Sequence, residues 1–307
     1  CLPEKSSVIG TMQYILPNEG VNVHYLAFAM EHMNLAKYFS GATIPHIYFK
    51  DYCTERLPKN SEAEQKQIST TLSRVTELIS LRKQQLSKLD ELVKARFVEM
   101  FGDSVANTKN FPSTTLETVM TVFPQNGLYK PQTDYVQDDT GIPILRIDAF
   151  YNGKVTNWNT LKRLICSETE IDRYLLKEND IVINRVNSIE YLGKCAHIVG
   201  LKEKTVFESN MMRFHMDEKK VNAVYVTEVL CTEDIYRQIL RRAKKSVNQA
   251  SINQEDVKSL EILVPPLSLQ NQFAAFVERV DQQKQTVQQS LEKLELMKKA
   301  LMQEYFG

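Results

Sequence analysis

The sequence predicts an α+β protein in which mixed α/β globular parts are joined by two long antiparallel coiled-coil helices, with the whole arrangement internally duplicated. Three observations predict it. A segment of about 40 residues ending in Phe101-Gly102 recurs 205 positions later, ending in Phe306-Gly307, with 13 identities in 38 aligned residues. Both copies carry a heptad pattern of apolar residues. Between them lie short β-like runs separated by turn residues. A period this long exceeds the roughly 20–50 residues of a solenoid repeat, so the unit is a duplicated module.

The first 40 residues match the region that precedes the second long helix. Val21-Asn22 and Tyr25 correspond to Val221-Asn222 and Tyr225. The match continues with small gaps, and it further pairs Met12 with Met212, Tyr14 with Phe214, Ala42-Thr43-Ile44 with Ala250-Ser251-Ile252, and Pro58 with Pro266. This alignment gives the first copy three extra residues between Pro58 and Gln65. The first module lacks a counterpart of residues 103–200, so we expect the chain to start inside a domain.

The two long helices are predicted by apolar residues that alternate in steps of four and three. Each copy has ten such positions, of which eight are apolar or aromatic. Arg82 and Arg96 interrupt the first stripe, and Lys284 and Lys298 interrupt the second. We call this stripe the seam, and its predicted pairing residues are Ile68, Leu72, Val75, Ile79, Leu86, Leu89, Val93, Phe273, Val277, Val280, Leu291, Leu294 and Leu301.

A helix with one apolar stripe gains most of its stability from packing, so each copy needs a partner. The other copy in the same chain is the simplest partner, and the 103–265 segment between them allows antiparallel pairing. Pairing with a separate subunit is the alternative. Forty helical residues at 1.5 Å rise would form a rod of about 60 Å.

Residues 112–215 are rich in short β-like runs, including 141–147, 180–186 and 194–199, and residues 221–242 have a helical pattern. We therefore predict four regions. They are 1–40, the end of a first globular domain; 41–102, with a long helix over 61–101; 103–250, a second globular domain; and 251–307, with a long helix over 268–306.

Composition excludes some classes of protein. The formal net charge is zero, so no whole-molecule field favours nucleic acid or membrane, although charge can be concentrated locally. The 5 cysteines are odd in number and scattered, which favours a reducing cytoplasm over a disulfide framework or zinc site. No apolar run approaches the roughly 18 residues of a membrane span.

Catalytic motifs are missing from the sequence. It contains no phosphate-binding loop of the G-x-x-x-x-G-K-[ST] type, no G-x-G-x-x-G and no H-E-x-x-H pair. An Asn/Asp-Pro-Pro-aromatic signature like that of base methyltransferases is also missing, because Pro265-Pro266 follows Val264 and precedes Leu267. We predict no catalytic, cofactor or metal site.

A basic segment is the first candidate for binding. Residues 235–254 contain five basic residues and no acid. Arg237, Arg241 and Lys244/Lys245 recur at helical spacing, which would place them on one helix face suited to phosphate contacts. A solvated helix end, where cations favour the dipole, is the equally weighted alternative.

A second candidate is the polar loop 184–194, which connects two predicted strands. Arg185 and Asn187 have side chains suited to bidentate contacts with base edges, while Tyr191 and Lys194 could add stacking and a phosphate contact. Loop 126–131, with Lys130, is similar. An ordinary polar surface is the competing interpretation.

Taken with the duplicated helix, several short motifs in this order closely resemble the specificity subunit of type I restriction-modification systems. The motifs are Gly141-Ile142-Pro143-Ile144-Leu145-Arg146, Asp180-Ile181-Val182-Ile183-Asn184-Arg185, Glu190-Tyr191-Leu192-Gly193-Lys194, Ser209-Asn210-Met211-Met212-Arg213, Gln249-Ala250-Ser251-Ile252-Asn253 and Val264-Pro265-Pro266-Leu267. The resemblance implies that residues 103–250 form a target recognition domain, that 1–40 is the tail of another, and that the long helices are the conserved spacer regions.

The resemblance also implies a non-catalytic subunit that reads a bipartite site in double-stranded DNA. Its implied partners are DNA methyltransferase (modification) subunits and restriction/translocase subunits, with S-adenosylmethionine, ATP and Mg²⁺ on the partners only. The candidate DNA-binding residues are Lys130, Arg146, Arg185, Asn187, Tyr191, Lys194, Arg241, Lys244 and Lys245. Half-sites on one DNA face recur about every 34–36 Å, which a rod of about 60 Å can span. A coiled-coil scaffold with protein-binding domains, and a nuclease or methyltransferase, are the alternatives.

Overall fold

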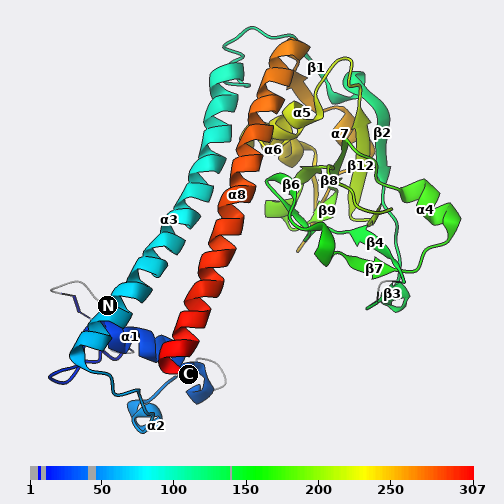
Figure 1. Ribbon diagram of the computed structural model, residues 1–307. Coiled ribbons are helices and arrows are strands. Elements are labelled where there is room, and N and C mark those ends of the chain that lie inside the picture. Colours follow the sequence, from blue (N-terminus) through cyan, green and yellow to red (C-terminus); the bar gives the residue numbers. More distant parts are fainter. Residues whose placement is uncertain (1–5, 8–11, 41–45, 139) are drawn as a thin grey trace. The chain divides into compact units, whose positions relative to one another are not determined.

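The computed structural model describes residues 6–7, 12–40, 46–138 and 140–307, so the predicted Ala42-Thr43-Ile44 match lies outside the described part. The chain divides into two compact units: unit 1, residues 1–91 with 280–307, and unit 2, residues 92–279. Both long helices contribute to both units. They are α3 (Glu62–Phe101) and α8 (Leu267–Phe306), each within one residue of the predicted bounds (Figure 1).

In the described part of unit 1 the elements are helices, apart from one β-bridge between Ser40 and His46. Besides its parts of α3 and α8, it contains α1 (Val23–His32), the 3₁₀ helix η1 (Leu35–Tyr38) and α2 (Phe49–Tyr52). Buried Tyr25, Ile68, Leu72 and Met302 form its core. The start of α3 therefore meets the end of α8, which makes the two helices antiparallel.

The predicted seam lies at the helix–helix contact. Nine of its thirteen residues are buried, and Ile79, Leu86, Leu294 and Leu301 are half-buried. In unit 2, the ring centroids of Phe97 and Phe101 each lie 5.5 Å from that of Phe273. Pairing thus occurs inside one chain and does not need a separate subunit.

The basic residues that interrupt the seam have partners. In unit 1, Lys284 pairs with Asp90, and Lys298 Nζ lies 2.7 Å from Glu31 Oε1. Arg82 Nε donates to Ser290 Oγ at 3.3 Å. Each of these three basic side chains thus reaches a polar group although it interrupts the seam.

Unit 2 contains the sheets. Its strands are β1 (Ser113–Thr115), β2 (Met120–Asn126), β3 (Tyr135–Val136), β4 (Ile142–Leu145), β5 (Phe150–Tyr151), β6 (Gly153–Val155), β7 (Lys162–Leu164), β8 (Asp180–Asn184), β9 (Val186–Asn187), β10 (Cys195–His197), β11 (Val206–Phe207), β12 (Met211–Met216), β13 (Lys244–Lys245), β14 (Ala250–Ser251) and β15 (Glu261–Leu263). Its shorter helices are α4 (Glu168–Tyr174), α5 (Ala223–Leu230), α6 (Glu233–Arg242) and α7 (Gln254–Lys258), with 3₁₀ helices η2 (Leu116–Val119), η3 (Gln132–Asp134), η4 (Trp158–Thr160) and η5 (Ile189–Tyr191).

Among the described residues the strands form four sheets. The largest has the order β2-β12-β8-β10-β6-β5, in which only β10 and β6 are parallel neighbours. The others have the orders β11-β4-β7-β3, β13-β14-β9 and β1-β15. Helix α5 packs against β8 and β10. The main core lies between strands of the two larger sheets, with Leu145, Val182, Phe207 and Met211 fully buried.

The continuous helical pattern predicted over 221–242 is two helices in the structure. Helix α5 ends at Leu230, and Thr232 begins α6 because its side chain accepts a hydrogen bond from the Ile235 backbone N–H. Such N-capping by threonine satisfies an N–H that has no partner inside the helix.

The prediction that Lys244 and Lys245 lie on one helix face with Arg237 and Arg241 is wrong. Helix α6 ends at Arg242, and the two lysines lie in β13, where Lys244 pairs with Ser251 and Lys245 with Ala250. Because neighbouring side chains of a strand point to opposite faces, the basic residues do not continue the face of α6.

In unit 1, the start of α1 is fixed to α3 by a set of polar contacts. The Asn22 N–H donates to Gln65 Oε1 at 2.9 Å, and the Asn22 side chain caps α1. The Tyr25 hydroxyl donates to the Pro58 carbonyl at 2.9 Å, and its ring lies 5.2 Å from that of Phe306.

Unit 2 repeats these contacts with equivalent residues. The Asn222 N–H donates to Gln270 Oε1 at 2.9 Å, and the Asn222 side chain caps α5. The Tyr225 hydroxyl donates to the Leu263 carbonyl at 3.0 Å, and its ring lies 4.6 Å from that of Phe101. The duplication therefore extends to individual hydrogen bonds.

These contacts correct the predicted match of Pro58 with Pro266. The tyrosine hydroxyls bond to the carbonyls of Pro58 and Leu263, and the glutamine amides bond to those of Asn60 and Pro265. Pro58 thus corresponds to Leu263, and there is no three-residue insertion before the first helix. The repeated feature is a backbone carbonyl, which residue identity does not reveal.

Candidate nucleic-acid interface

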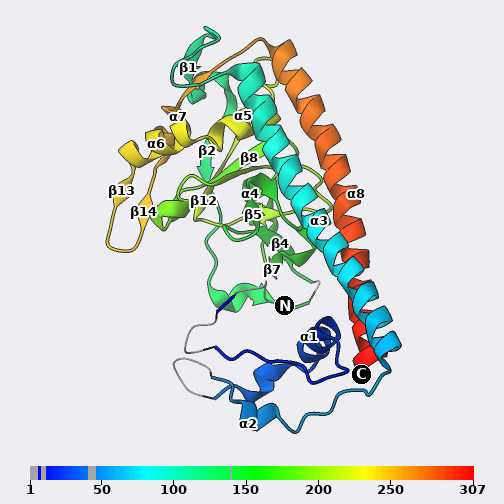
Figure 2. The ribbon, with the colours of Figure 1, turned by 90° about the vertical axis from the view of Figure 1, so that its left-hand side faces the viewer.

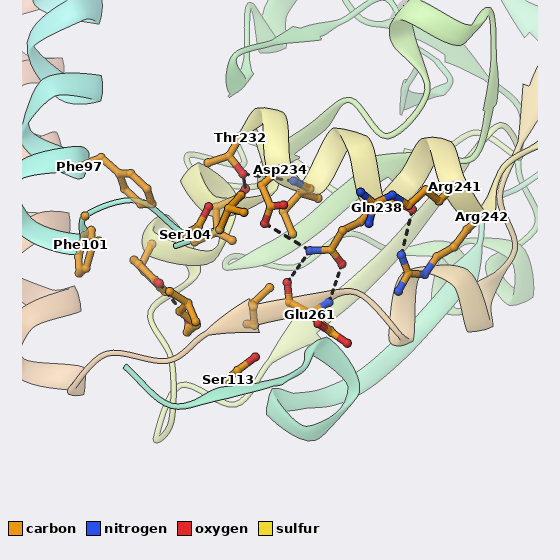
Figure 3. Close-up of a pocket in the computed structure, with 17 residues that line it drawn as sticks. Phe97, Phe101, Ser104, Ser113, Thr232, Asp234, Gln238, Arg241, Arg242 and Glu261 are labelled. Carbon is orange, nitrogen blue, oxygen red and sulfur yellow. Dashed lines mark hydrogen bonds between the residues drawn. The ribbon is translucent and has the colours of Figure 1, made fainter. Parts of the chain in front are cut away.

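Helix α6 is held against the end of α7 and the start of β15 by Gln238 and Arg242. The Gln238 side chain accepts from the Glu261 N–H at 2.9 Å and donates to the Glu261 carbonyl at 3.0 Å. Arg242 donates to the side chain and carbonyl of Ser259, each at 3.0 Å. Figure 3 shows Gln238, Arg242 and Glu261 at the edge of a pocket of about 300 Å³. The paired hydrogen bonds between Gln238 and Glu261 therefore position α6.

Not all cations of α6 are available to a ligand. Arg242 is held as above, and Arg237 Nε lies 3.4 Å from Glu233 Oε1. Arg241, Lys244 and Lys245 are exposed, and no ion pair within the described residues engages them. The exposed positive charge without an ion pair among the described residues is therefore at the end of α6 and in β13.

The small sheet β13-β14-β9 joins the two candidate segments of the sequence. Ala250 pairs with Asn187 and Ser251 with Val186. The Ile252 N–H donates to the Arg185 carbonyl at 2.9 Å. The basic segment and the polar loop, some 60 positions apart in the sequence, thus lie side by side.

Helix α6 also packs on the polar loop. The Tyr236 hydroxyl donates to the Ile189 carbonyl at 3.1 Å. Gly193 has a φ of +76°, a conformation that favours glycine, and a Cβ there would lie 2.3 Å from Ile239 Cδ1. We name the resulting surface the basic surface; it comprises Arg185, Asn187, Tyr191, Arg241, Lys244 and Lys245.

Within the basic surface, Arg185 and Asn187 are half-buried. Arg185 Nη1 donates to the Ser209 carbonyl at 3.2 Å, and its Nε is buried without an acceptor among the described residues. The Asn187 side chain accepts from the Ser188 N–H. Tyr191 is 47% exposed and could stack on a ligand. These geometries leave only part of each polar side chain for base contacts.

Lys194 is not available for the predicted phosphate contact. Its Nζ donates to the Ile147 carbonyl at 2.9 Å and lies 3.6 Å from the ring centroid of Tyr151 and 4.8 Å from that of Phe150. Burial lowers the pKa of its ammonium group. Lys194 therefore holds the β4–β5 connection in place beside exposed Tyr151.

Arg146 is also held internally. Its Nη1 donates to the Tyr135 hydroxyl at 3.1 Å, and its Nε lies 3.9 Å from Glu208 Oε2. Burial raises the pKa of the Glu208 carboxyl, which accepts from the Ile147 N–H at 2.6 Å. Arg146 and Lys194 thus converge on the same connection at Ile147, although the Lys194 backbone N–H also donates to the carbonyl of Tyr191 in the basic surface.

Lys130 lies neither in the basic surface nor at Ile147, but beside two acidic residues. Its Nζ lies 3.0 Å from Glu170 Oε1 and 3.3 Å from Asp134 Oδ2. Hydrogen bonding to Glu170 raises the pKa of the Lys130 ammonium, so it stays charged but neutralised by two carboxylates. A phosphate contact there would have to compete with both.

Asp180 and Arg213 lie in the sequence motifs without a predicted role, and both serve the fold. Asp180 is fully buried, and it accepts from the Lys177 N–H at 2.8 Å and bonds to His215 Nδ1 at 2.9 Å. Arg213 Nη1 lies 3.7 Å from the same carboxylate. Burial raises the pKa of Asp180. The polar cluster of Asp180, Arg213 and His215 joins the start of β8 to the later part of β12, inside the largest sheet.

In the part of the chain that the structure describes, no group of three or more His, Cys, Asp or Glu side chains could hold a metal ion. No described helix is long and apolar enough to cross a membrane. Cys53, Cys166, Cys195 and Cys231 are free thiols.

The family model described as the type I restriction modification DNA specificity domain matches residues 110–296, which include the whole basic surface. The chain belongs to this family. The specificity domain accordingly covers all the strands of unit 2 and reaches into α8.

Curated relatives agree with the family. The chain is 30% identical over 187 residues to the MjaX type I restriction enzyme specificity subunit of Methanocaldococcus jannaschii. The aligned segment covers 59% of this chain and 42% of that protein. It is 24% identical over 278 residues to the type I restriction enzyme EcoKI specificity subunit of Escherichia coli, covering 86% and 58%. The chain thus spans about half the length of these relatives.

A solved structure shows the same fold. It is the type I restriction-modification system S subunit from M. genitalium, with a TM-score of 0.61 at 14% identity, covering 94% of this chain and 73% of that one. The predicted fold class, with antiparallel long helices and an internal duplication, is confirmed.

Proposed function

We propose that this chain is the sequence-specific DNA-recognition subunit of a type I restriction-modification complex. The observation that carries the proposal is the match of the specificity-domain family to the residues that form the basic surface. Exposed Arg241, Lys244 and Lys245 would contact phosphates and fix the register, while Arg185, Asn187 and Tyr191 would lie near base edges.

The chain would direct partner methyltransferase and restriction subunits to a bipartite site in duplex DNA. The paired α3 and α8 would act as a spacer between two recognition elements, one of them in unit 2. The chain itself would be non-catalytic and would act in the cytoplasm. S-adenosylmethionine, ATP and Mg²⁺ would bind to the partners.

Co-purification with a modification subunit, followed by methylome sequencing of the host, tests this proposal. We expect a stable complex and methylation at one bipartite sequence, with duplex binding that weakens steeply as salt rises. Methyl transfer or cleavage by the chain alone would favour an enzyme instead. Stable complexes without salt-dependent DNA binding would favour a protein scaffold.

A further inference from the structure

Strands β13 and β14 form a short hairpin at the edge of the basic surface. Ser246 closes it, because its N–H and hydroxyl donate to the Gln249 carbonyl at 2.8 and 2.9 Å. Figure 2 shows this loop extending past the end of α6 and away from the larger sheets of unit 2. The hairpin is thus a defined projection.

The base of the hairpin is firmly anchored. Ala250 and Ile252 are each 2% exposed, and β14 pairs with β9. Because β9 follows Arg185 directly, movement of the hairpin would disturb the polar loop. The tip can therefore be presented in a fixed orientation relative to the rest of the basic surface.

The tip displays side chains that do nothing for the fold. Val247 is 98% exposed, and Asn248 and Gln249 are exposed as well. Among the described residues, no hydrogen bond or ion pair engages the side chains of these three. A fully exposed valine on a projecting tip gains nothing from burial, so its contribution must come from a ligand or be nil.

The surrounding charge points to a polyanion as that ligand. Lys244 and Lys245 stand at the base of the hairpin, Arg241 precedes them, and residues 235–254 contain no acid. Lysines on an edge strand can also serve only to prevent edge-to-edge pairing. That role does not account for the apolar and amide side chains at the tip.

We propose that the β13–β14 hairpin enters the major groove of duplex DNA and that Val247, Asn248 and Gln249 are specificity-determining residues. The major groove, about 12 Å wide, admits a two-stranded β-ribbon. Asn and Gln amides match the paired donor and acceptor of adenine, and an apolar side chain fits the thymine methyl. The lysines would reach the flanking phosphates. This inference rests on the proposed function.

The test uses the full chain in complex with its modification subunit and a pool of duplexes carrying 20 random base pairs. We compare the wild type with Asn248→Ala/Gln249→Ala, with Val247→Ser, and with Lys244→Glu/Lys245→Glu as the matched control. The amide variants should lose about 5- to 150-fold discrimination at one or two A·T positions, with an unchanged salt slope. Val247→Ser should relax preference at a T·A position.

The control distinguishes base recognition from electrostatic attraction to phosphates. The lysine variant should weaken the binding of all duplexes alike and lower the salt slope. If the tip variants select the same bases as the wild type, the hairpin inference is overturned, while selection by the wild type keeps the proposed function. If they lose the modification subunit instead, the hairpin docks protein and the inference fails. If the wild-type complex selects no sequence, the proposed function itself fails.

Discussion

At the scale of single residues, a basic side chain can serve the fold or a ligand, and its neighbours decide which. Lys194, Arg146 and Lys130 all have internal partners. Lys244 and Lys245 have none among the described residues. Sequence composition cannot separate these groups, since the partners come from remote positions, such as Ile147 for Lys194.

His197 gives a prediction at this scale, because burial lowers its pKa from 6.5 to about 4. In the unfolded chain the imidazole would bind a proton near pH 6.5, so the unfolded state holds more protons between pH 6.5 and 4. Stability is therefore fully present above pH 6.5 and is lost as pH falls towards 4. Between pH 7.5 and 5 this loss is about 2 kcal/mol.

Replacing His197 by Gln should remove that part of the pH dependence, which urea unfolding of both proteins at pH 7.5 and 5 would measure. Buried Asp180 and Glu208 contribute with the opposite sign, since burial raises the pKa of each carboxyl. The difference between wild type and variant isolates the histidine. An equal loss of stability in the two proteins would contradict a neutral His197 in the folded chain.

At the scale of elements, the long helices were predictable from the sequence to within one residue. Their heptad pattern is a local signal repeated many times. A glycine, Gly102 or Gly307, follows the C-terminal end of each helix. The break between α5 and α6 and the strand at Lys244 were not predictable in this way. Thr232 acts through one capping bond, and β13 forms by pairing with β14, which in turn pairs with β9.

The antiparallel register inside unit 1 predicts a charge-reversal effect at Lys284 and Asp90. Lys284→Glu places two carboxylates together and should destabilise the chain by about 0.5–1 kcal/mol, since the pair is partly exposed. Adding Asp90→Lys should restore most of that loss. Thermal unfolding of the two single variants and the double variant measures the coupling.

Lys293→Glu is the matched control, because Lys293 is exposed on the same helix. It should change stability little, and Asp90→Lys should not rescue it. Rescue of both lysine variants alike would mean that only the net charge of the helix matters, and the predicted register would be wrong.

At the scale of the whole molecule, the duplication organises the fold, and the sequence revealed it through the helices. The equivalent contacts of Asn22 and Asn222 lie about 40 residues upstream, where identities are few. The candidate surface was only half predictable. Arg185 and Lys244 were singled out separately, but nothing in the sequence indicated that strand pairing brings their segments together, nor that Val247 stands at a projecting tip.

A net charge of zero makes the last prediction possible, because attraction to DNA must then come from local charge. Lys244→Glu/Lys245→Glu and Lys204→Glu/Lys219→Glu each change the net charge by −4, and all four lysines are exposed in unit 2. Only the first pair belongs to the basic surface. We expect it to weaken duplex binding at 100 mM salt and to reduce the salt slope by about 2, at roughly 0.9 for each lost phosphate contact.

The second pair should leave the slope of the logarithmic salt plot unchanged and lower affinity only slightly, through the long-range field. Fluorescence anisotropy with a duplex of the host's methylated sequence, measured between 50 and 200 mM salt, would compare the two variants. Equal slopes for both would mean that DNA responds to total charge alone, and the basic surface would then not be where phosphates bind. A lower slope for the first pair only would locate phosphate contacts in β13, where the hairpin begins.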